Sequence, residues 1–122
     1  MRYTSYSNKQ SEIVKSGIDA IAETLNNGNT SEKESLLLCL DKFLDPYYGY
    51  NLPHKNEIIL LLENVIVNQN SIGVKEDALN LLTSYCYPPF NILESNIDKI
   101  ESELLPDVKY AINMDEEFSK QS

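Results

Sequence analysis

The chain has 122 residues, of which 42% are hydrophobic and 24% are charged, a composition that suits one folded domain and argues against general disorder. Its formal net charge of −9 repels phosphate backbones, so nucleic-acid binding is disfavoured and a basic protein partner is favoured. The start, MRYTSYSNKQ, lacks the apolar core of a secretory signal, and no apolar run reaches the roughly 18 residues that span a bilayer. We therefore expect a cytoplasmic protein with no membrane contact.

Apolar residues recur with the 3.6-residue period of a helix along most of the chain. The first predicted helix spans residues 11–26 and ends at an Asn-Gly pair. Ser31 is the expected N-cap of the second helix because Glu34 follows at capping-box spacing, and Asp45-Pro46 ends that helix. No segment has the convincing alternation of a strand, so the sequence predicts an all-α protein.

The third predicted helix follows Pro53 and runs through Ile58 to Val67. The later ones span 72–85 and 91–103, and a short last helix has Pro106 in its first turn. The third of the six is apolar nearly all round, which is typical of a helix in the middle of a bundle. The prediction is one α-helical domain over residues 1–122, with frayed tails at 1–10 and 115–122.

An internal repeat relates the second and fourth predicted helices. EKESLLLCLDKFLDPYY at 32–48 aligns without a gap on VKEDALNLLTSYCYPPF at 74–90, so that Lys33 matches Lys75. DVKYAI at 107–112 restates the opening of the second copy. Two helices that share an apolar stripe agree in part without any repetition, and this alternative stays open.

The segments VKEDALNLL at 74–82 and DVKYAI at 107–112 resemble the valine-basic-x-x-alanine opening of the second helix in each pair of the HEAT-like repeat family. The resemblance covers residues 31–112. It implies about six helices stacked as antiparallel pairs in a short HEAT-like α-α superhelix. The first copy has Glu32 where the family pattern has valine, as a terminal capping repeat does.

Two loops rich in tyrosine, DPYYGYNLPH at 45–54 and YCYPPFN at 85–91, would each connect one helix pair to the next. In a stack of pairs such loops emerge along one edge. Tyrosine offers a large contact area at a low cost in rotamer entropy, so these loops predict a protein-binding edge. The alternative is packing: Tyr85 lies on the apolar stripe of its helix, and Tyr47 and Phe90 are placed to cover helix ends.

Acidic residues recur on the outward faces of the same helices. Tyrosines and acidic or polar residues together form the candidate partner-binding set: Glu34, Asp41, Asp45, Tyr47, Tyr48, Tyr50, Glu76, Asn80, Tyr87 and Glu101. Carboxylates that serve only solubility are the alternative interpretation of the acidic members.

The sequence contains few residues of the kinds that perform chemistry. The single histidine, His54, stands at the start of a predicted helix, and Cys39 and Cys86 lie far apart without neighbouring metal ligands. No glycine-rich phosphate loop and no serine elbow occur. We therefore expect no enzymatic activity, no cofactor and no bound metal. The cysteines are expected to be buried free thiols, with one disulfide as the alternative.

In size, acidity and HEAT-like pattern the chain is similar to immunity proteins of bacterial contact-dependent toxin systems, which are small, acidic and often helical. This resemblance implies an immunity protein that binds a cognate basic toxin domain, a nuclease, one to one and masks its active site. The alternative function is a HEAT-like adaptor or scaffold subunit of a larger protein assembly.

Overall fold

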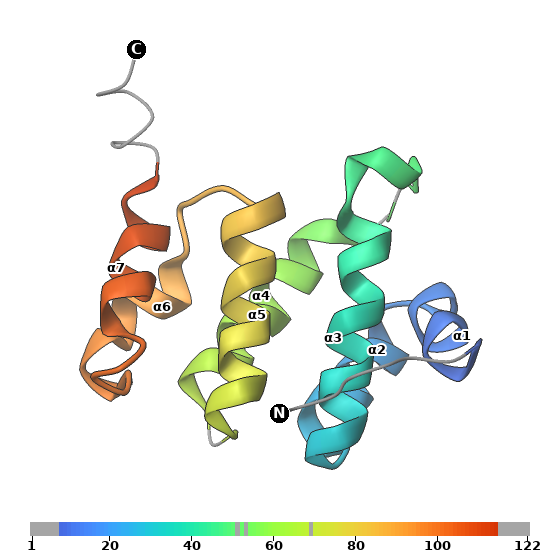
Figure 1. Ribbon diagram of the computed structural model, residues 1–122, viewed down its shortest axis with the longest axis horizontal. Coiled ribbons are helices and arrows are strands. Elements are labelled where there is room, and N and C mark those ends of the chain that lie inside the picture. Colours follow the sequence, from blue (N-terminus) through green and yellow to red (C-terminus); the bar gives the residue numbers. More distant parts are fainter. Residues whose placement is uncertain (1–7, 51, 53, 69, 115–122) are drawn as a thin grey trace.

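The computed structural model describes residues 8–50, 52, 54–68 and 70–114, and this part of the chain is helical with no strand (Figure 1). Two short 3-10 helices, η1 and η2, accompany the α-helices. The elements are α1 (Asn8–Ser16), α2 (Ile18–Asn27), α3 (Thr30–Leu44), η1 (Pro46–Tyr48), α4 (Lys55–Val67), α5 (Ile72–Tyr85), α6 (Asn91–Ser95), η2 (Ile97–Lys99) and α7 (Leu105–Ile112). The predicted all-α class is confirmed.

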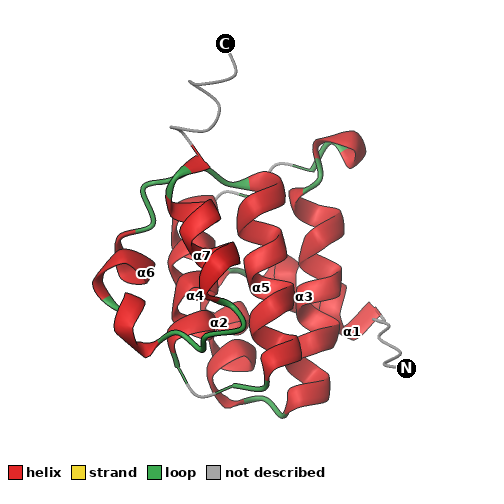
Figure 2. Ribbon diagram, turned by 60° about the vertical axis from the view of Figure 1, so that its left-hand side comes forward, coloured by secondary structure: helices red, strands yellow, loops and turns green. Residues whose placement is uncertain are grey.

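The helices form antiparallel pairs that stack in two layers (Figures 1 and 2). One layer contains α2, α4 and α6, and the other contains α3, α5 and α7, with α5 packed between α3 and α7. Helices α3, α5 and α7 run in the same direction, so their C-terminal ends lie at the same end of the stack (Figure 1). Helix α1 packs beside α2 and α3 at the N-terminal side.

A continuous apolar core lies between the two layers. Helix α4 contacts α2, α5 and α6, which is why its sequence is apolar nearly all round. Full burial of one leucine side chain contributes about 1.5–3 kcal/mol. The fully buried side chains with almost no exposure include Leu36, Leu40, Leu62, Ile66, Leu82, Leu93 and Val108.

The prediction of one helix over residues 11–26 is wrong, because the chain breaks at Gly17. Gly17 has a φ of 115°. Residues with a Cβ rarely adopt this backbone angle, whereas glycine adopts it at little cost. The break lets α1 turn away from α2 and pack against α3 as well. Residues 8–10, expected to fray, form the first turn of α1, while 1–7 and 115–122 lie outside the described residues.

The predicted N-cap of the second helix is also displaced. Asn29, not Ser31, is the N-cap of α3: its side chain accepts a hydrogen bond from the Glu32 backbone at 2.8 Å, and the Glu32 carboxylate accepts one from the Asn29 backbone at 3.0 Å. This is the reciprocal capping box, two residues earlier than the Ser31–Glu34 pair predicted it.

The prediction of a continuous helix over residues 91–103 is wrong as well. Helix α6 ends at Ser95, and η2 follows after Asn96, whose side chain donates to the Ile92 carbonyl at 2.8 Å. Ile100 and Leu104 still enter the core, which explains why the apolar spacing imitated a longer helix. The prediction of a helix over 72–85 matches α5 residue for residue.

Candidate functional site

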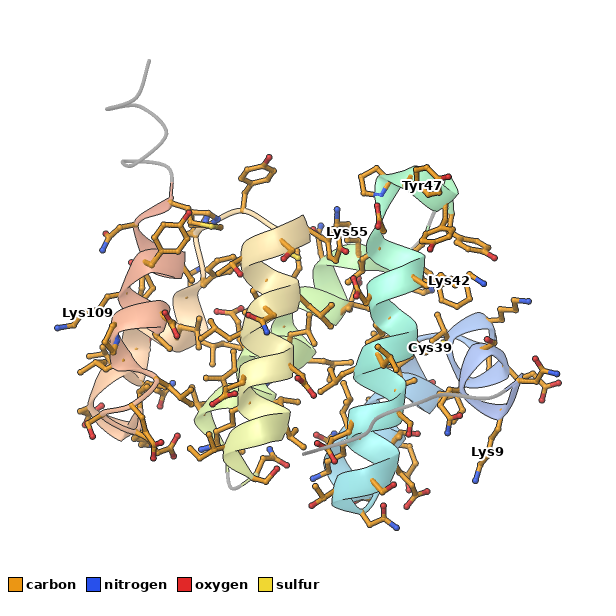
Figure 3. The ribbon with its side chains drawn as sticks, viewed as in Figure 1. Lys9, Cys39, Lys42, Tyr47, Lys55 and Lys109 are labelled. Atoms are coloured by element: carbon orange, nitrogen blue, oxygen red, sulfur yellow. The ribbon has the colours of Figure 1, made fainter. Side chains whose placement is uncertain are left out.

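The two tyrosine-rich loops lie at the same end of the stack, as the pairing of helices predicts (Figure 1). Tyr47 projects from this end (Figure 3) and is 87% exposed, and Tyr87 is 68% exposed. We call the exposed tyrosines of these loops the tyrosine rim: Tyr47, Tyr48, Tyr50 and Tyr87. Large aromatic side chains left this exposed are typical of a surface that contacts a partner.

The local sequence explains how the first half of the rim is built. Asp45 caps the short helix η1, since its Oδ1 accepts a hydrogen bond from the Tyr47 backbone at 3.0 Å. Pro46 occupies the first turn, where no donor is needed. Gly49 ends η1 with a φ of 72°, which favours glycine. The DPYYG sequence therefore holds Tyr47 and Tyr48 on a defined turn.

The three rim tyrosines of the first loop are also held by contacts with each other and with α3. The ring centroids of Tyr47 and Tyr48 are 5.2 Å apart, edge to face. Tyr50 packs against Phe43 with a centroid distance of 4.5 Å. The Lys42 ammonium lies 5.8 Å from the Tyr48 ring centroid and 5.9 Å from that of Tyr50, within the range of a cation–π interaction. Tyr50 thus combines packing with exposure.

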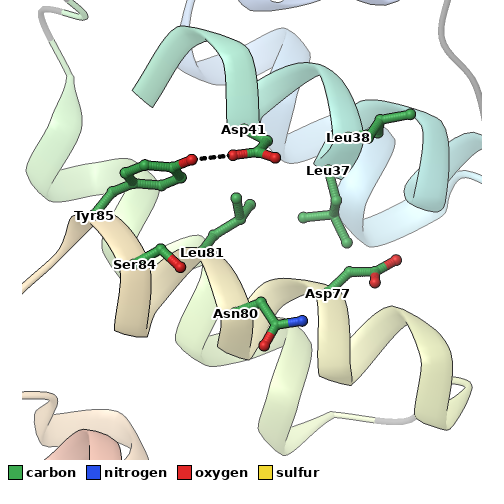
Figure 4. Close-up of a pocket in the computed structure, with 8 residues that line it drawn as sticks. All are labelled: Leu37, Leu38, Asp41, Asp77, Asn80, Leu81, Ser84 and Tyr85. Atoms are coloured by element: carbon green, nitrogen blue, oxygen red, sulfur yellow. Dashed lines mark hydrogen bonds between the residues drawn. The ribbon is translucent and has the colours of Figure 1, made fainter. Parts of the chain in front are cut away.

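A hollow of about 300 Å³ lies between α3 and α5, in the layer that contains α3, α5 and α7 (Figure 4). We call it the α3/α5 groove. Its lining residues are Leu37, Leu38, Asp41, Asp77, Asn80, Leu81, Ser84 and Tyr85. The Tyr85 hydroxyl donates a hydrogen bond to Oδ1 of Asp41 across the groove (Figure 4). This bond to the carboxylate, with burial as a smaller cause, raises the pKa of Tyr85 to about 12.

A second hollow of about 210 Å³ continues from the groove toward the tyrosine rim. It shares Leu38 and Asp41 with the groove and adds Lys42, Asp45 and Tyr48. The groove and the rim are therefore parts of one surface, with carboxylates inside and phenol rings at the end.

The structure brings most of the predicted contact residues to this surface. Asp41, Asp45 and Asn80 line the hollows, and all four predicted rim tyrosines are exposed. Glu34 and Glu76 lie outside the linings of both hollows, on α3 and α5. Glu101 lies in the turn before α7, and its Oε1 is 2.6 Å from Nζ of the buried Lys75. Glu101 thus has a role inside the molecule, and we leave it out of the candidate surface.

Sequence reasoning missed three polar residues of the groove: Asp77, Ser84 and Tyr85. The contact residues predicted on α5 were Glu76 and Asn80, whereas the groove face also includes Asp77 and Ser84, one residue after Glu76 and four after Asn80. The i, i+4, i+7 spacing of Asp77, Leu81 and Ser84 could have indicated this face. Tyr85 was expected to pack inward, and it is half-buried with its hydroxyl at the groove.

Potential metal ligands and thiols are few among the described residues. No group of three or more His, Cys, Asp or Glu side chains among them is placed to hold a metal ion. Cys39 and Cys86 are buried free thiols. Burial raises the pKa of both thiols, that of Cys86 to about 11. Within the same part of the chain, each helix is too short or too polar to cross a membrane.

Comparison of the chain with protein-family models, with curated proteins and with solved structures gave no match. The functional interpretation therefore depends on the surface described above. Its carboxylate and carbonyl oxygens accept hydrogen bonds, and its exposed rings offer apolar area. Such an arrangement can bind a cationic protein surface.

Proposed function

We propose that this chain is an immunity protein that acts in the bacterial cytoplasm. It binds one basic toxin domain, of the nuclease class, and masks the toxin's active site. A nuclease that binds a phosphate backbone carries cations in its cleft, and the net charge of −9 attracts such a surface over a distance.

One observation carries the proposal: the tyrosine rim adjoins an acidic groove on a single surface. Complementary charge sets the rate and specificity of association, while buried aromatic anchors supply much of the affinity. Asp41 lines both hollows and so lies where the two kinds of contact meet. Exposed rings such as Tyr47 and Tyr87 are the expected anchors.

An adaptor subunit is the second candidate, and one feature of the last helix favours it. Lys33 and Lys75, equivalent in the repeat, each reach forward to the turn within the next helix pair, at Asn70 and Glu101. Lys109, at the matching position of the third copy, points away from the stack at its outer end (Figure 3). A further helix pair from a partner could use this end, as in a longer assembly.

The test of the immunity proposal starts from the tagged full chain. The protein it captures from the source cell is identified and purified, and binding of the pure pair is measured. We expect a one-to-one complex whose association rate falls steeply with added salt. A complex of higher stoichiometry with little salt dependence would favour the adaptor instead.

Two matched variants locate the interface on the captured partner. Tyr47→Ala combined with Tyr87→Ala should weaken binding by about tenfold or more, because interface anchors typically contribute over 1 kcal/mol each. Tyr110→Ala is the control, since Tyr110 is exposed on α7 outside both hollows. Equal losses in the control and the test variant would contradict the proposed rim.

Charge reversal tests the acidic half of the surface. Asp41→Lys with Asp45→Lys should slow association with the basic partner while helical circular dichroism is kept. Asp19→Lys with Glu23→Lys makes the same change of net charge on α2, in the opposite layer. If both pairs slow association equally at low salt, overall charge and not this surface attracts the partner.

A further inference from the structure

A cavity of about 350 Å³ lies where α1 ends and where α2 and α4 begin. We call it the α1/α4 cavity. It shares no lining residue with the α3/α5 groove, with the second hollow or with the tyrosine rim. Its volume lies within the range of small-molecule sites, about 300–1,000 Å³. The cavity is therefore a candidate site separate from the proposed protein-binding surface.

The inner walls of the α1/α4 cavity are apolar and belong to the core. Val14, Ile21 and Ile58 line it and are each 3% exposed or less. Ile18 and Leu52 also line it and are only partly buried against the core. Side chains at the wall of a cavity have no contact atoms on its open side. An apolar chain placed here would therefore add dispersion contacts and remove apolar area from water.

The polar side chains of the lining are donors. Lys15 comes from the last turn of α1, and His54 directly precedes α4. An ammonium only donates, and an imidazole has a ring N–H in each of its protonation states. Ser16 also lines the cavity, but its hydroxyl donates to the Glu12 carbonyl at 2.7 Å. Among the described residues that line this cavity there is no aspartate or glutamate, although the whole chain has 19 of them.

Lys15 and His54 are both available to a ligand. Their side chains are exposed, and within the described part of the chain neither forms an ion pair or a side-chain hydrogen bond. The carboxylates nearest to them in the sequence, Glu12, Asp19 and Glu57, are exposed and lie outside the lining. In a chain of net charge −9, this cavity thus presents positive charge beside apolar walls. Charge complementarity favours an anionic group at its mouth.

We infer that the α1/α4 cavity binds a small monocarboxylate with an apolar chain, a ligand class that the proposed immunity function does not require. The carboxylate accepts hydrogen bonds from the Lys15 ammonium and the His54 ring at the mouth, and charge-assisted bonds of this kind are strong. The apolar chain packs on Ile18, Leu52 and the buried walls behind them.

The number of charges at the mouth favours a carboxylate over a phosphate. Lys15 is the only lysine or arginine among the described lining residues, so it balances one negative charge. A phosphate monoester brings nearly two negative charges and three acceptor oxygens. A carboxylate brings one charge and two oxygens, which matches one ammonium and one ring N–H.

The site can be tested with hexanoate as the probe. Hexanoate is titrated into the ¹⁵N-labelled full chain near neutral pH, where a carboxylic acid is ionised. Hexan-1-ol keeps the apolar chain without charge, hexylammonium reverses the charge, and acetate keeps the head without the chain. We expect saturable shifts at the backbone amides of Gly17, Ile18, Leu52 and His54. Hexanoate should bind more tightly than each of the three comparators.

A matched pair of variants separates the site from a general effect of charge. Lys15→Gln with His54→Gln should weaken hexanoate binding by about tenfold, since hydrogen bonds to charged groups contribute about that factor or more. Lys99→Gln with Lys109→Gln removes at least as much positive charge at exposed positions outside the cavity and should leave binding nearly unchanged. Helical circular dichroism checks that both variants fold.

Several outcomes would overturn the carboxylate site. If hexan-1-ol or hexylammonium binds as tightly as hexanoate, the cavity does not select an anion. Equal losses in the two variants would show that overall charge, and not this pair of donors, sets the affinity. Self-association of the chain that is lost in Lys15→Gln/His54→Gln would assign the cavity to a second copy. Hexanoate binding that Tyr47→Ala with Tyr87→Ala leaves unchanged would support a site separate from the tyrosine rim.

Discussion

The two junctions between successive helix pairs contain equivalent lysines that bind different partners. At the junction of α2–α3 with α4–α5, the half-buried Lys33 donates to Oδ1 of Asn70 at 2.7 Å. At the junction of α4–α5 with α6–α7, Lys75 is 4% exposed and donates to Oε1 of Glu101 at 2.6 Å. The same repeat position thus bonds a neutral amide at a half-buried site in one junction and forms a buried ion pair in the other.

A second buried ionisable residue, Glu63, lies at the C-terminal junction. Glu63 on α4 is 1% exposed, and its Oε1 accepts hydrogen bonds from the backbones of Ile92 at 3.0 Å and Leu93 at 3.2 Å. Glu63 thereby supplies acceptors to the first turn of α6, which has no side-chain cap of its own. The N-terminal junction instead contains the α3/α5 groove. We call the C-terminal junction, where Glu63 and Lys75 are buried, the sealed junction, and the N-terminal junction, which contains the hollow, the open junction.

The largest effect of a single change is expected at the sealed junction. Glu101→Ala should lower the free energy of unfolding by about 3 kcal/mol, because it leaves the Lys75 ammonium buried without its carboxylate. Asn70→Ala, the equivalent change at the open junction, should cost about 1 kcal/mol or less, since water can solvate Lys33. Urea unfolding of both variants measures the difference. Equal losses would mean that the two junctions do not differ in this respect.

Glu63 allows its charge to be separated from its acceptor oxygens. Glu63→Ala should cost about 2 kcal/mol, since the two backbone donors of α6 lose their partner in a buried place. Glu63→Gln keeps an acceptor oxygen and should cost much less near neutral pH. Urea unfolding of the two variants at one pH gives the comparison, and a glutamine variant as unstable as the alanine variant would show that the charge itself is required.

The stability of the wild-type chain relative to Glu63→Gln should also depend on pH. Burial raises the pKa of Glu63 above its ordinary value of 4.5, so the folded state favours the protonated acid. This contribution to stability is fully present below pH 4.5 and is lost as the pH rises through the raised pKa. The wild-type chain should therefore lose stability relative to Glu63→Gln over that rise. A constant difference across the range would contradict the assignment.

The smallest effect is expected at the open junction. Tyr85→Phe removes one partly exposed hydrogen bond to Asp41 and should cost about 1 kcal/mol or less. The Tyr85 phenol should titrate at about 12, and Asp41→Asn should lower this pKa toward 10.0. Because the folded pKa is raised, the stabilising contribution is present below pH 10 and lost between 10 and about 12. Difference absorbance between wild type and Tyr85→Phe follows the titration, and an unchanged curve in Asp41→Asn would exclude this cause.

The sequence by itself determined the features that depend on neighbouring residues. The apolar period between Ile72 and the Pro88-Pro89 pair places α5 correctly, and the DPYYG turn follows from an aspartate cap, a proline and a glycine. The repeat alignment matched Lys33 with Lys75, and both lysines do reach the turn of the next pair. Such features are local because caps, turns and helical stripes involve residues a few positions apart.

Only the tertiary structure decided which polar residues are covered and which are left open. Nothing in the sequence near Glu63 or Glu101 tells them apart from solvated carboxylates. In the structure Glu63 is buried, and Glu101 forms an ion pair with Lys75. Asp77 lies on the groove face because of how α5 is rotated against α3. The cost of burying a charge depends on neighbours brought from 26 or 29 positions away, and no local pattern specifies those neighbours.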